Sequence, residues 1–270
     1  MTQLSLPAHL EAYRTEIEAT MVPTIKATAT SQETTLWDSK VGGVPYFPKD
    51  MPYPKNTKGT PMRLLAQLNL SELPSTFSEL PNEGILQFFL QQDEDDDLYG
   101  ADYDNLTNQE GFKVIYHEKV VEDESHLLTD FSFVEGLVDE LLLPIEPDTE
   151  AKLTFSEKQE PVSFCDFRFD NLLGNVIPEF ITVDGQEHDL IEEYAEHFDS
   201  SGHKIGGYAC FTQADPRDED TSQAFLLFQL DSDTKIDCIW GDMGVGNFFI
   251  SPEDLRNRNF SNVLYTWDCG

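Results

Sequence analysis

Residues 84–90 read GILQFFL, and residues 244–250 read GVGNFFI. Two further pairs of stretches share this order: LLAQL at 64–68 with LLFQL at 226–230, and KVGG at 40–43 with KIGG at 204–207. The second member of each pair follows the first by 160, 162 or 164 residues. Matches in the same order at a nearly constant offset are the signature of an internal repeat. The sequence therefore predicts a duplicated structural unit.

Each unit has the pattern of antiparallel β structure. The runs at 64–68 and 226–230 are short, apolar and flanked by turn residues, as is typical of buried strands. Residues 81–84 (PNEG) and 241–244 (GDMG) mark the turns that precede the two Phe-Phe strands. The Gly-Gly pairs predict a tight or bulged backbone where the chain enters a strand.

Helices are expected beside each unit. Apolar residues recur every three or four positions over 6–21 and again over 190–198, where Gly202 is expected to stop the helix. Ser251, followed by Pro252 and two acidic residues, is a typical helix N-terminus.

The expected fold class is α+β and β-rich, since helices stand beside runs of strands without regular βαβ alternation. Two antiparallel β units related by internal duplication, with flanking helices, would pack into one globular body. We divide the chain into residues 1–92 (N-terminal helix and first β unit), 93–202 (an acidic connecting segment with strands and a helix) and 203–270 (second β unit and tail). Further strands are expected at 24–30 and 112–116.

The chain is strongly acidic, with 17 Lys and Arg against 51 Asp and Glu in 270 residues, a net charge of −34. Nucleic acid and anionic membrane surfaces are therefore not expected partners. The net charge is −2 over residues 1–92, −26 over 93–202 and −6 over 203–270. A uniform adaptation to high salt would not concentrate acid in one segment, so this distribution favours binding of a basic partner there.

Localisation is expected to be cytoplasmic. No basic stretch followed by an apolar run opens the sequence, and no run of 18 apolar residues occurs. The four cysteines, Cys165, Cys210, Cys238 and Cys269, are widely spaced and form no Cys-x-x-Cys pair, as expected of reduced thiols.

The second unit carries longer motifs, HKIGGYA at 203–209, LLFQLDSD at 226–233 and WGDMGVGNFFI at 240–250. These motifs, with PYFP at 45–48 in the first unit, resemble the YwqG-like family of bacterial proteins, catalogued as a domain of unknown function. The resemblance covers roughly residues 40–267 and is patchy between 93 and 200. It implies a cytoplasmic, β-rich α+β protein, and it supplies no reaction, cofactor or catalytic residue.

Four residues are candidates for ligand binding. Gln67 and Gln229 place an amide inside an apolar strand, where it must find hydrogen bonds or cost about 1–3 kcal/mol. The amides would pair across a pseudo-two-fold axis or with the Gly-Gly backbone of the other unit; a polar ligand held between the units is the alternative. Tyr208 and Trp240 would line a peptide or sugar groove if exposed, or belong to the core if buried.

Three aspartates, Asp231, Asp233 and Asp242, lie on turns that flank the same expected strands. Convergent carboxylates could bind Ca²⁺ or Mg²⁺, which need several oxygen ligands. The competing interpretation is that these residues form turns through local hydrogen bonds. Beyond such an ion, the sequence predicts no cofactor.

An acidic run, Asp93, Glu94, Asp95, Asp96 and Asp97, is the candidate contact for a partner. Two functions are compatible with these patterns. The first is a non-catalytic acidic binding module for a basic protein, immunity- or inhibitor-like. The alternative is a small-molecule or divalent-metal-dependent enzyme with its site at the junction of the two units.

Overall fold

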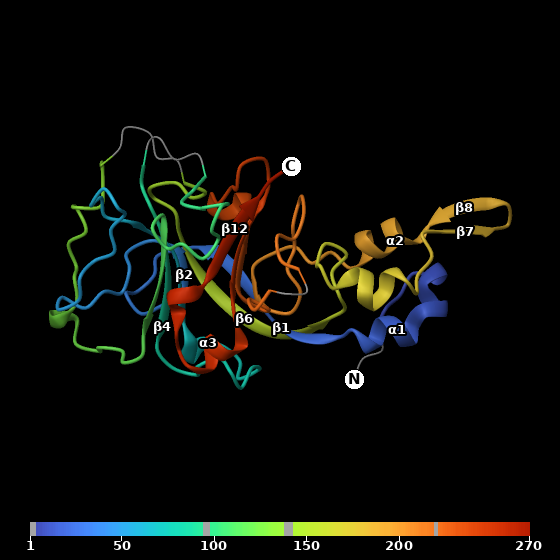
Figure 1. Ribbon diagram of the computed structural model, residues 1–270. Helices are drawn as coiled ribbons and strands as arrows, with labels where there is room; N and C mark the ends of the chain where they lie inside the picture. Colours follow the sequence, from blue (N-terminus) through green and yellow to red (C-terminus); the bar gives the residue numbers. More distant parts are fainter. Residues whose placement is uncertain (1–3, 94–97, 138–142, 219–220) are drawn as a thin grey trace.

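The structure, a computed structural model, describes residues 4–93, 98–137, 143–218 and 221–270. Most strands of this part of the chain join one antiparallel sheet, and β7 and β8 form a separate hairpin (Figure 1). The strands are β1 Val22–Ser31, β2 Lys40–Gly42, β3 Arg63–Asn69, β4 Ile85–Leu90, β5 Phe112–His117, β6 Glu150–Glu160, β7 Phe180–Val183, β8 Gln186–Asp189, β9 Lys204–Gly206, β10 Phe225–Asp231, β11 Val245–Ile250 and β12 Leu264–Asp268. The expected β-rich fold is confirmed.

The ten strands of the large sheet lie in the order β12-β11-β10-β9-β1-β6-β2-β3-β4-β5. Strands β2–β5 form one flank and β9–β12 the other, and both flanks carry the same irregularity. The register of β3 on β4 shifts between Leu64 and Ala66, and that of β10 on β11 between Leu226 and Phe228. The two long central strands are exchanged between the flanks. Strand β1 comes before the earlier flank in the sequence but pairs with β9 of the later flank, and β6 comes before the later flank but pairs with β2 of the earlier one.

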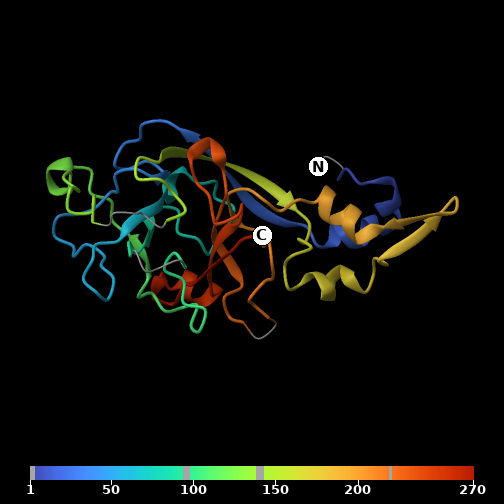
Figure 2. The same ribbon diagram turned by 90° about the horizontal axis from the view of Figure 1, so that it is seen from above.

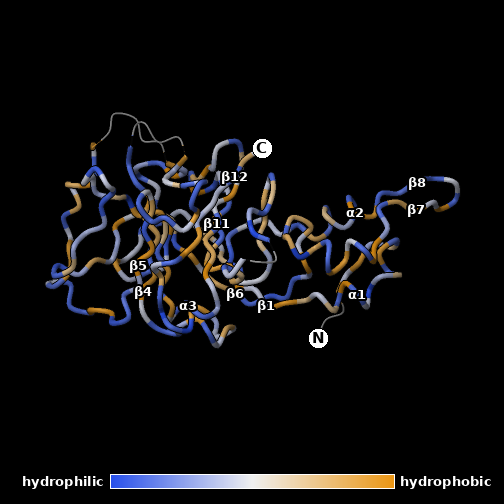
Figure 3. The backbone as a smooth tube through the Cα atoms, viewed as in Figure 1, coloured by the Kyte–Doolittle hydropathy of each residue, from blue (hydrophilic) through white to orange (hydrophobic). Residues whose placement is uncertain are grey.

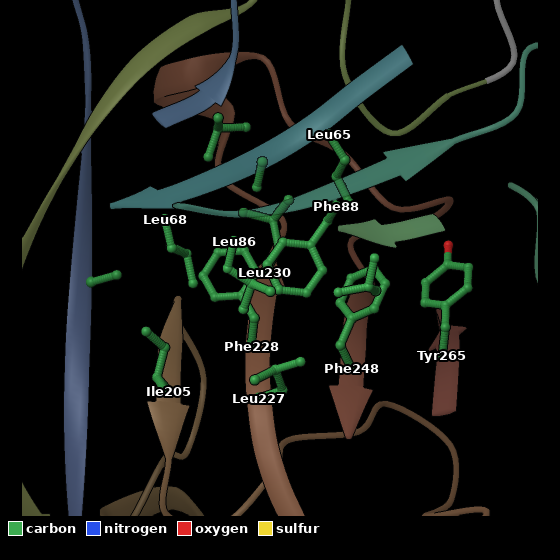
Figure 4. Packing of buried hydrophobic residues seen from close by; sticks show 14 of the residues in the cluster. Leu65, Leu68, Leu86, Phe88, Ile205, Leu227, Phe228, Leu230, Phe248 and Tyr265 are labelled. Carbon is green, nitrogen blue, oxygen red and sulfur yellow. The ribbon is translucent and has the colours of Figure 1, made fainter. Parts of the chain in front are cut away.

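The sheet curls until its two ends meet, which makes it nearly closed. The rings of Phe112 on β5 and Tyr265 on β12 have centroids 5.0 Å apart. Phe88 packs against Phe228 and Phe248 of the other flank, with centroids 5.3 and 4.6 Å away (Figure 4). Aromatic side chains therefore fill the junction of the two units, where the enzyme hypothesis places its site.

A second body of structure lies beyond the ends of β1 and β6 (Figures 1 and 2). We call it the acidic lobe, residues 4–21 and 161–202. Its core is a separate cluster: Leu10, Ile17, Val162, Phe169, Leu173, Ile177, Leu190 and Tyr194, joined by Tyr208. The helices predicted at 6–21 and 190–198 pack on each other and not on the sheet. The structure therefore has a sheet body and a separate lobe, where a single globular body was expected.

The helices follow the predicted start signals more closely than the predicted ends. The helical segments are η1 Ala8–Tyr13, α1 Arg14–Ala19, η2 Leu70–Glu72, η3 Glu124–His126, η4 Asp170–Gly174, α2 Leu190–His197, η5 Thr234–Ile236, α3 Pro252–Arg256 and η6 Phe260–Asn262. Ser251 caps α3 by accepting the backbone N–H of Asp254, as predicted. Helix α2 ends at His197, before the expected Gly202. Among the described residues, no helix combines the length and the apolarity that crossing a bilayer requires.

The Gly-Gly pairs end strands instead of opening them, which corrects the expectation. Gly42 and Gly43 have φ of +65° and +66°, and Gly206 and Gly207 both have φ of +71°. Besides the left-handed backbone, space is short: a Cβ on Gly42 would lie 2.1 Å from the carbonyl oxygen of Thr149. Only glycine combines this conformation with this approach.

Candidate functional site

The predicted ligand candidate Gln67 is a buried hydrogen-bonding clamp. Its Oε1 accepts the backbone N–H of Tyr46 at 2.9 Å. Its Nε2 donates to the carbonyl oxygens of Leu36 and Asp38, both at 2.9 Å. The amide thus holds the loops that precede and follow β2, and it lies fully buried.

Gln229 makes the corresponding bonds in the other flank. Its Oε1 accepts the N–H of Cys210 at 2.8 Å, and its Nε2 donates to the carbonyls of Ser200 and Gly202 at 3.1 and 2.8 Å. Each of these partners follows its counterpart around Gln67 by 164 residues. The partners lie in the segments that precede and follow β2 or β9, neither across the pseudo-two-fold axis nor on the Gly-Gly pair of the other unit. They leave no amide donor for a ligand.

A second buried amide extends the first clamp to His117. Gln87 Nε2 donates to the carbonyl of Tyr46 and to Gln67 Oε1, at 2.6 and 2.8 Å. Its Oε1 must therefore accept, so the His117 Nε2 at 2.8 Å carries the proton. Burial lowers the pKa of His117 to about 4. The imidazole is neutral and structural at neutral pH.

We expect His117 to make the protein less stable in mild acid. Its folded pKa lies below the unfolded value of about 6.5, so its contribution is complete above pH 6.5 and is lost as the pH falls toward the folded pKa. Between pH 7 and 5 the loss should be about 2 kcal/mol in the free energy of unfolding. Urea unfolding at both pH values measures it, and His117→Gln should abolish that part of the pH dependence. Equal pH dependence in wild type and variant would contradict the assignment.

Tyr208 and Trp240, the aromatic candidates, lie in different hydrophobic clusters. The Tyr208 hydroxyl donates to the carbonyl of Thr20 at 2.7 Å, and the Arg168 guanidinium lies 4.5 Å from its ring centroid. Trp240 is fully buried in the sheet body, against Trp267. The structure does not bring the two rings together, and both serve as core.

Two of the three aspartates proposed as metal ligands accept hydrogen bonds from backbone N–H groups. Asp231 accepts the N–H groups of Gly202 and Ser232 at 2.5 and 2.8 Å, and Asp233 accepts that of Lys235 at 2.9 Å. Asp242 is exposed. Within the described ranges, no three His, Cys, Asp or Glu side chains gather closely enough to hold a metal ion. Of the three, Asp233 fits the turn interpretation, since it caps η5. The ion stays a prediction.

Of the acidic run at 93–97, the structure describes only the first residue, Asp93. Asp93 pairs with the ammonium group of Lys58 at 2.6 Å. Glu94, Asp95, Asp96 and Asp97 lie outside the described residues. Their part in partner binding stays a prediction.

The acidic lobe carries far more carboxylates than cations. It contains thirteen Asp and Glu against two Arg, a net charge of −11. Arg14 is bound by Glu11 and Glu18, and Arg168 by Asp166. Ten of the carboxylates are exposed: Glu11, Glu16, Glu18, Asp170, Glu179, Asp184, Glu187, Glu192, Glu196 and Asp199.

The same lobe exposes large apolar side chains. Five of the twelve exposed large hydrophobic residues in the described chain lie here: Phe164, Leu172, Val176, Phe180 and Val183. Phe180 on β7 is 48 % exposed. Figure 3 shows apolar residues along the β7 strand of this hairpin. Exposed apolar side chains among polar ones are typical of interaction surfaces.

A buried ion network that the sequence analysis missed fixes the lobe to the sheet body. Arg217 is 1 % exposed and pairs with Asp215 at 2.7 Å and with Asp166 of the lobe at 3.2 Å. Its guanidinium lies 3.8 Å from the ring centroid of Phe249 on β11. The sequence pattern that could have predicted this network is an Asp-x-Arg motif that occurs twice. Asp166 and Asp215 each bind the Arg two residues later.

The network is charged. Burial by itself would raise the pKa of Asp166, but the hydrogen bonds from Arg168 and the positive charges of Arg168 and Arg217 outweigh burial and hold that pKa below its usual value. The lobe is therefore anchored by ionised groups at neutral pH.

Together, the nearly closed sheet and the anchored acidic lobe define a β-rich protein with one strongly charged end. Residues 39–269 match the family described as a domain of unknown function (DUF1963), and the chain belongs to this family. None of the curated proteins matches the chain.

Proposed function

We propose that the chain is a non-catalytic binding module whose acidic lobe binds a basic protein, in the manner of an immunity protein or inhibitor. The observation that carries this proposal is the coincidence, on one lobe, of a net charge of −11 with five exposed large apolar side chains. A charged surface without exposed apolar side chains would be explained by solubility. An exposed apolar surface without the charge would favour self-association of the protein.

The two features have complementary roles in such an interface. Exposed carboxylates attract a cationic partner at long range and orient it. Apolar side chains such as Phe180 and Leu172 then contribute the contacts that exclude water at the centre of the interface. The buried Arg217 network keeps the lobe in place, so that partner binding need not first order it.

We expect neutralisation of the lobe to weaken partner binding. The test variant changes Glu179, Glu187 and Glu196 to Gln and Asp184 to Asn. All four side chains are exposed, and this variant should lower affinity for the basic partner about tenfold or more. Pull-down from cells of the source organism, at 50 and 500 mM NaCl, would identify basic proteins that wild type retains only at low salt.

A matched control separates the lobe from overall charge. Changing Glu83, Glu122 and Glu124 to Gln and Asp242 to Asn removes the same charge from exposed positions of the sheet body and should leave partner capture unchanged. Equal capture by the lobe variant and the control would contradict the proposal. Loss of capture only after replacement of residues 93–97 would move the contact to the acidic run.

A third variant tests the apolar contribution. Phe180→Ser should weaken partner binding while leaving its salt dependence unchanged, because it removes contact area and no charge. The ratio of affinities at the two salt concentrations is the measurement. An unchanged affinity would restrict the interface to the carboxylates.

We further propose that the two flanks arose by duplication and that the chain is a YwqG-like, bacterial and cytoplasmic member of its family. The amide clamps of Gln67 and Gln229, with partners that correspond at a constant offset, support the duplication. The motifs at 203–209, 226–233 and 240–250 support the YwqG-like assignment. The four cysteines are free thiols, as expected in a reducing compartment.

A further inference from the structure

Five of the eleven lysines of this acidic chain lie on one face of the central strands β1 and β6 and their neighbours β2 and β9. They are Lys26, Lys40, Lys152, Lys158 and Lys204. Lys26 stands directly opposite Lys204 across β1 and β9, and Lys40 directly opposite Lys152 across β2 and β6. Like charges directly opposite each other destabilise a sheet, so each pair needs a compensating anion or acceptor.

In the earlier flank the protein supplies that compensation itself. The ammonium group of Lys152 pairs with Asp38 Oδ1 at 2.9 Å. The ammonium group of Lys40 donates to the carbonyls of Thr35 and Val44, at 2.7 and 2.6 Å. Both lysines of this pair are thereby satisfied.

In the later flank the compensation is incomplete. Lys204 pairs with Glu160 Oε1 at 3.0 Å. Lys26 occupies the position that corresponds to Lys152, but no carboxylate or other acceptor among the described residues bonds its ammonium group. The residue that corresponds to Asp38, 164 positions later, is Gly202. The carboxylate that neutralises the earlier pair therefore has no counterpart here.

A second lysine faces the same space. Lys158 stands opposite Thr24 across β6 and β1, so its side chain shares the face of Lys26. Like Lys26, it is exposed and has no bonded acceptor in the part of the chain that the structure describes. Two uncompensated ammonium groups thus project from neighbouring strands.

A cavity of about 220 Å³ lies over these lysines. Lys26, Lys158, Lys204, Thr24, Ser200 and His203 are among its lining residues. The two carboxylates that also line it are already engaged: Glu160 binds Lys204 and the N–H of Tyr208, and Asp199 binds the N–H and hydroxyl of Ser201. They leave Lys26 and Lys158 available to an anion.

We propose that this lysine pocket binds a small phosphorylated molecule. Ammonium groups on adjacent strands beside the cavity provide the point charges that a multivalent phosphate prefers. The cavity exceeds the volume of phosphate alone, so it has room for a small organic group. The anion would take the place that Asp38 fills in the earlier flank.

The pocket contains none of the four carboxylates that the lobe variant changes. Its walls come from the central strands, from β9 and from the lobe segment at the end of α2. A bound anion would touch the sheet body and the lobe at once, and should therefore stabilise their attachment.

The test is a titration of the full chain with inorganic phosphate at constant ionic strength, followed by calorimetry and by melting temperature. Lys26→Met and Lys158→Met should each weaken phosphate binding about tenfold or more. Lys55→Met, which removes an exposed lysine outside the pocket, should change it less than about twofold. Glycerol phosphate, run in parallel, distinguishes the source: tighter binding than inorganic phosphate indicates a phosphate monoester, and equal binding indicates free phosphate.

Two results would overturn the proposal. The first is a phosphate effect that NaCl reproduces at equal ionic strength. The second is equal phosphate binding by wild type, both pocket variants and the Lys55→Met control. Because Lys26 and Lys158 are exposed, the variants should fold, and urea unfolding would verify it. Loss of the basic partner in the lobe variants would leave this titration unchanged.

Discussion

Arg217→Met should lower the free energy of unfolding by about 3 kcal/mol or more, because it removes one member of a buried ion network. Asp166 and Asp215 are 0 % and 3 % exposed in their side chains. Without the guanidinium, Asp215 would lose its bidentate partner, and a buried unpaired carboxylate is far more costly than the pair was favourable. The loss of contact with the Phe249 ring adds to the effect.

Urea unfolding at pH 7 measures this loss, with Arg256→Met as the control. Arg256 is exposed on α3, so its replacement should change stability by less than about 0.5 kcal/mol. A loss below about 1 kcal/mol for Arg217→Met would show that solvent reaches the network. Limited proteolysis provides a second readout, since cleavage confined to the lobe would show that this network is what anchors it.

Gln229→Leu should be comparably destabilising, by about 3 kcal/mol, because it removes three hydrogen bonds that a buried amide makes to partly buried backbone groups. The groups are the N–H of Cys210 and the carbonyls of Ser200 and Gly202. Leucine has nearly the volume of glutamine, so the substitution removes hydrogen bonds without opening a large cavity.

Gln67→Leu provides a matched measurement in the other flank. Its three backbone bonds correspond to those of Gln229, and it also accepts a bond from Gln87, so its loss should be equal or larger. Gln32→Leu, at an exposed position, is the control and should be nearly neutral. A loss in one flank much smaller than in the other would show that the two clamps are not energetically equivalent.

The sequence predicted the strands of the two flanks because their apolar runs and turns repeat. It could not show the exchange of the central strands, since β1 and β6 lie outside the repeated stretches. Residues 150–160 were assigned to a connecting segment, although Ala151 and Leu153 alternate with Lys152 and Thr154 as a strand requires. Pairing between distant strands is decided by tertiary packing, which a single sequence does not reveal.

The sequence showed where acidic residues concentrate, but the exposed apolar side chains of the lobe were not predictable. Leu172 is 41 % exposed, whereas its neighbour Leu173 is fully buried. Helical geometry separates the two, and only the position of the lobe core decides which one is buried. The lysine pocket was likewise not predictable, because Lys26 and Lys204 line the same cavity only through the pairing of β1 with β9.

The exchange of β1 and β6 has a consequence for how the protein is made. Strand β1 leaves the ribosome early, but its partners are residues 151–160 and 204–206. At usual translation rates, β1 waits on the order of ten seconds with both edges open before the first partner emerges. Such unpaired edges are templates for aggregation, and contacts so distant in sequence form slowly. Synthesis of an isolated first half should therefore yield an insoluble product.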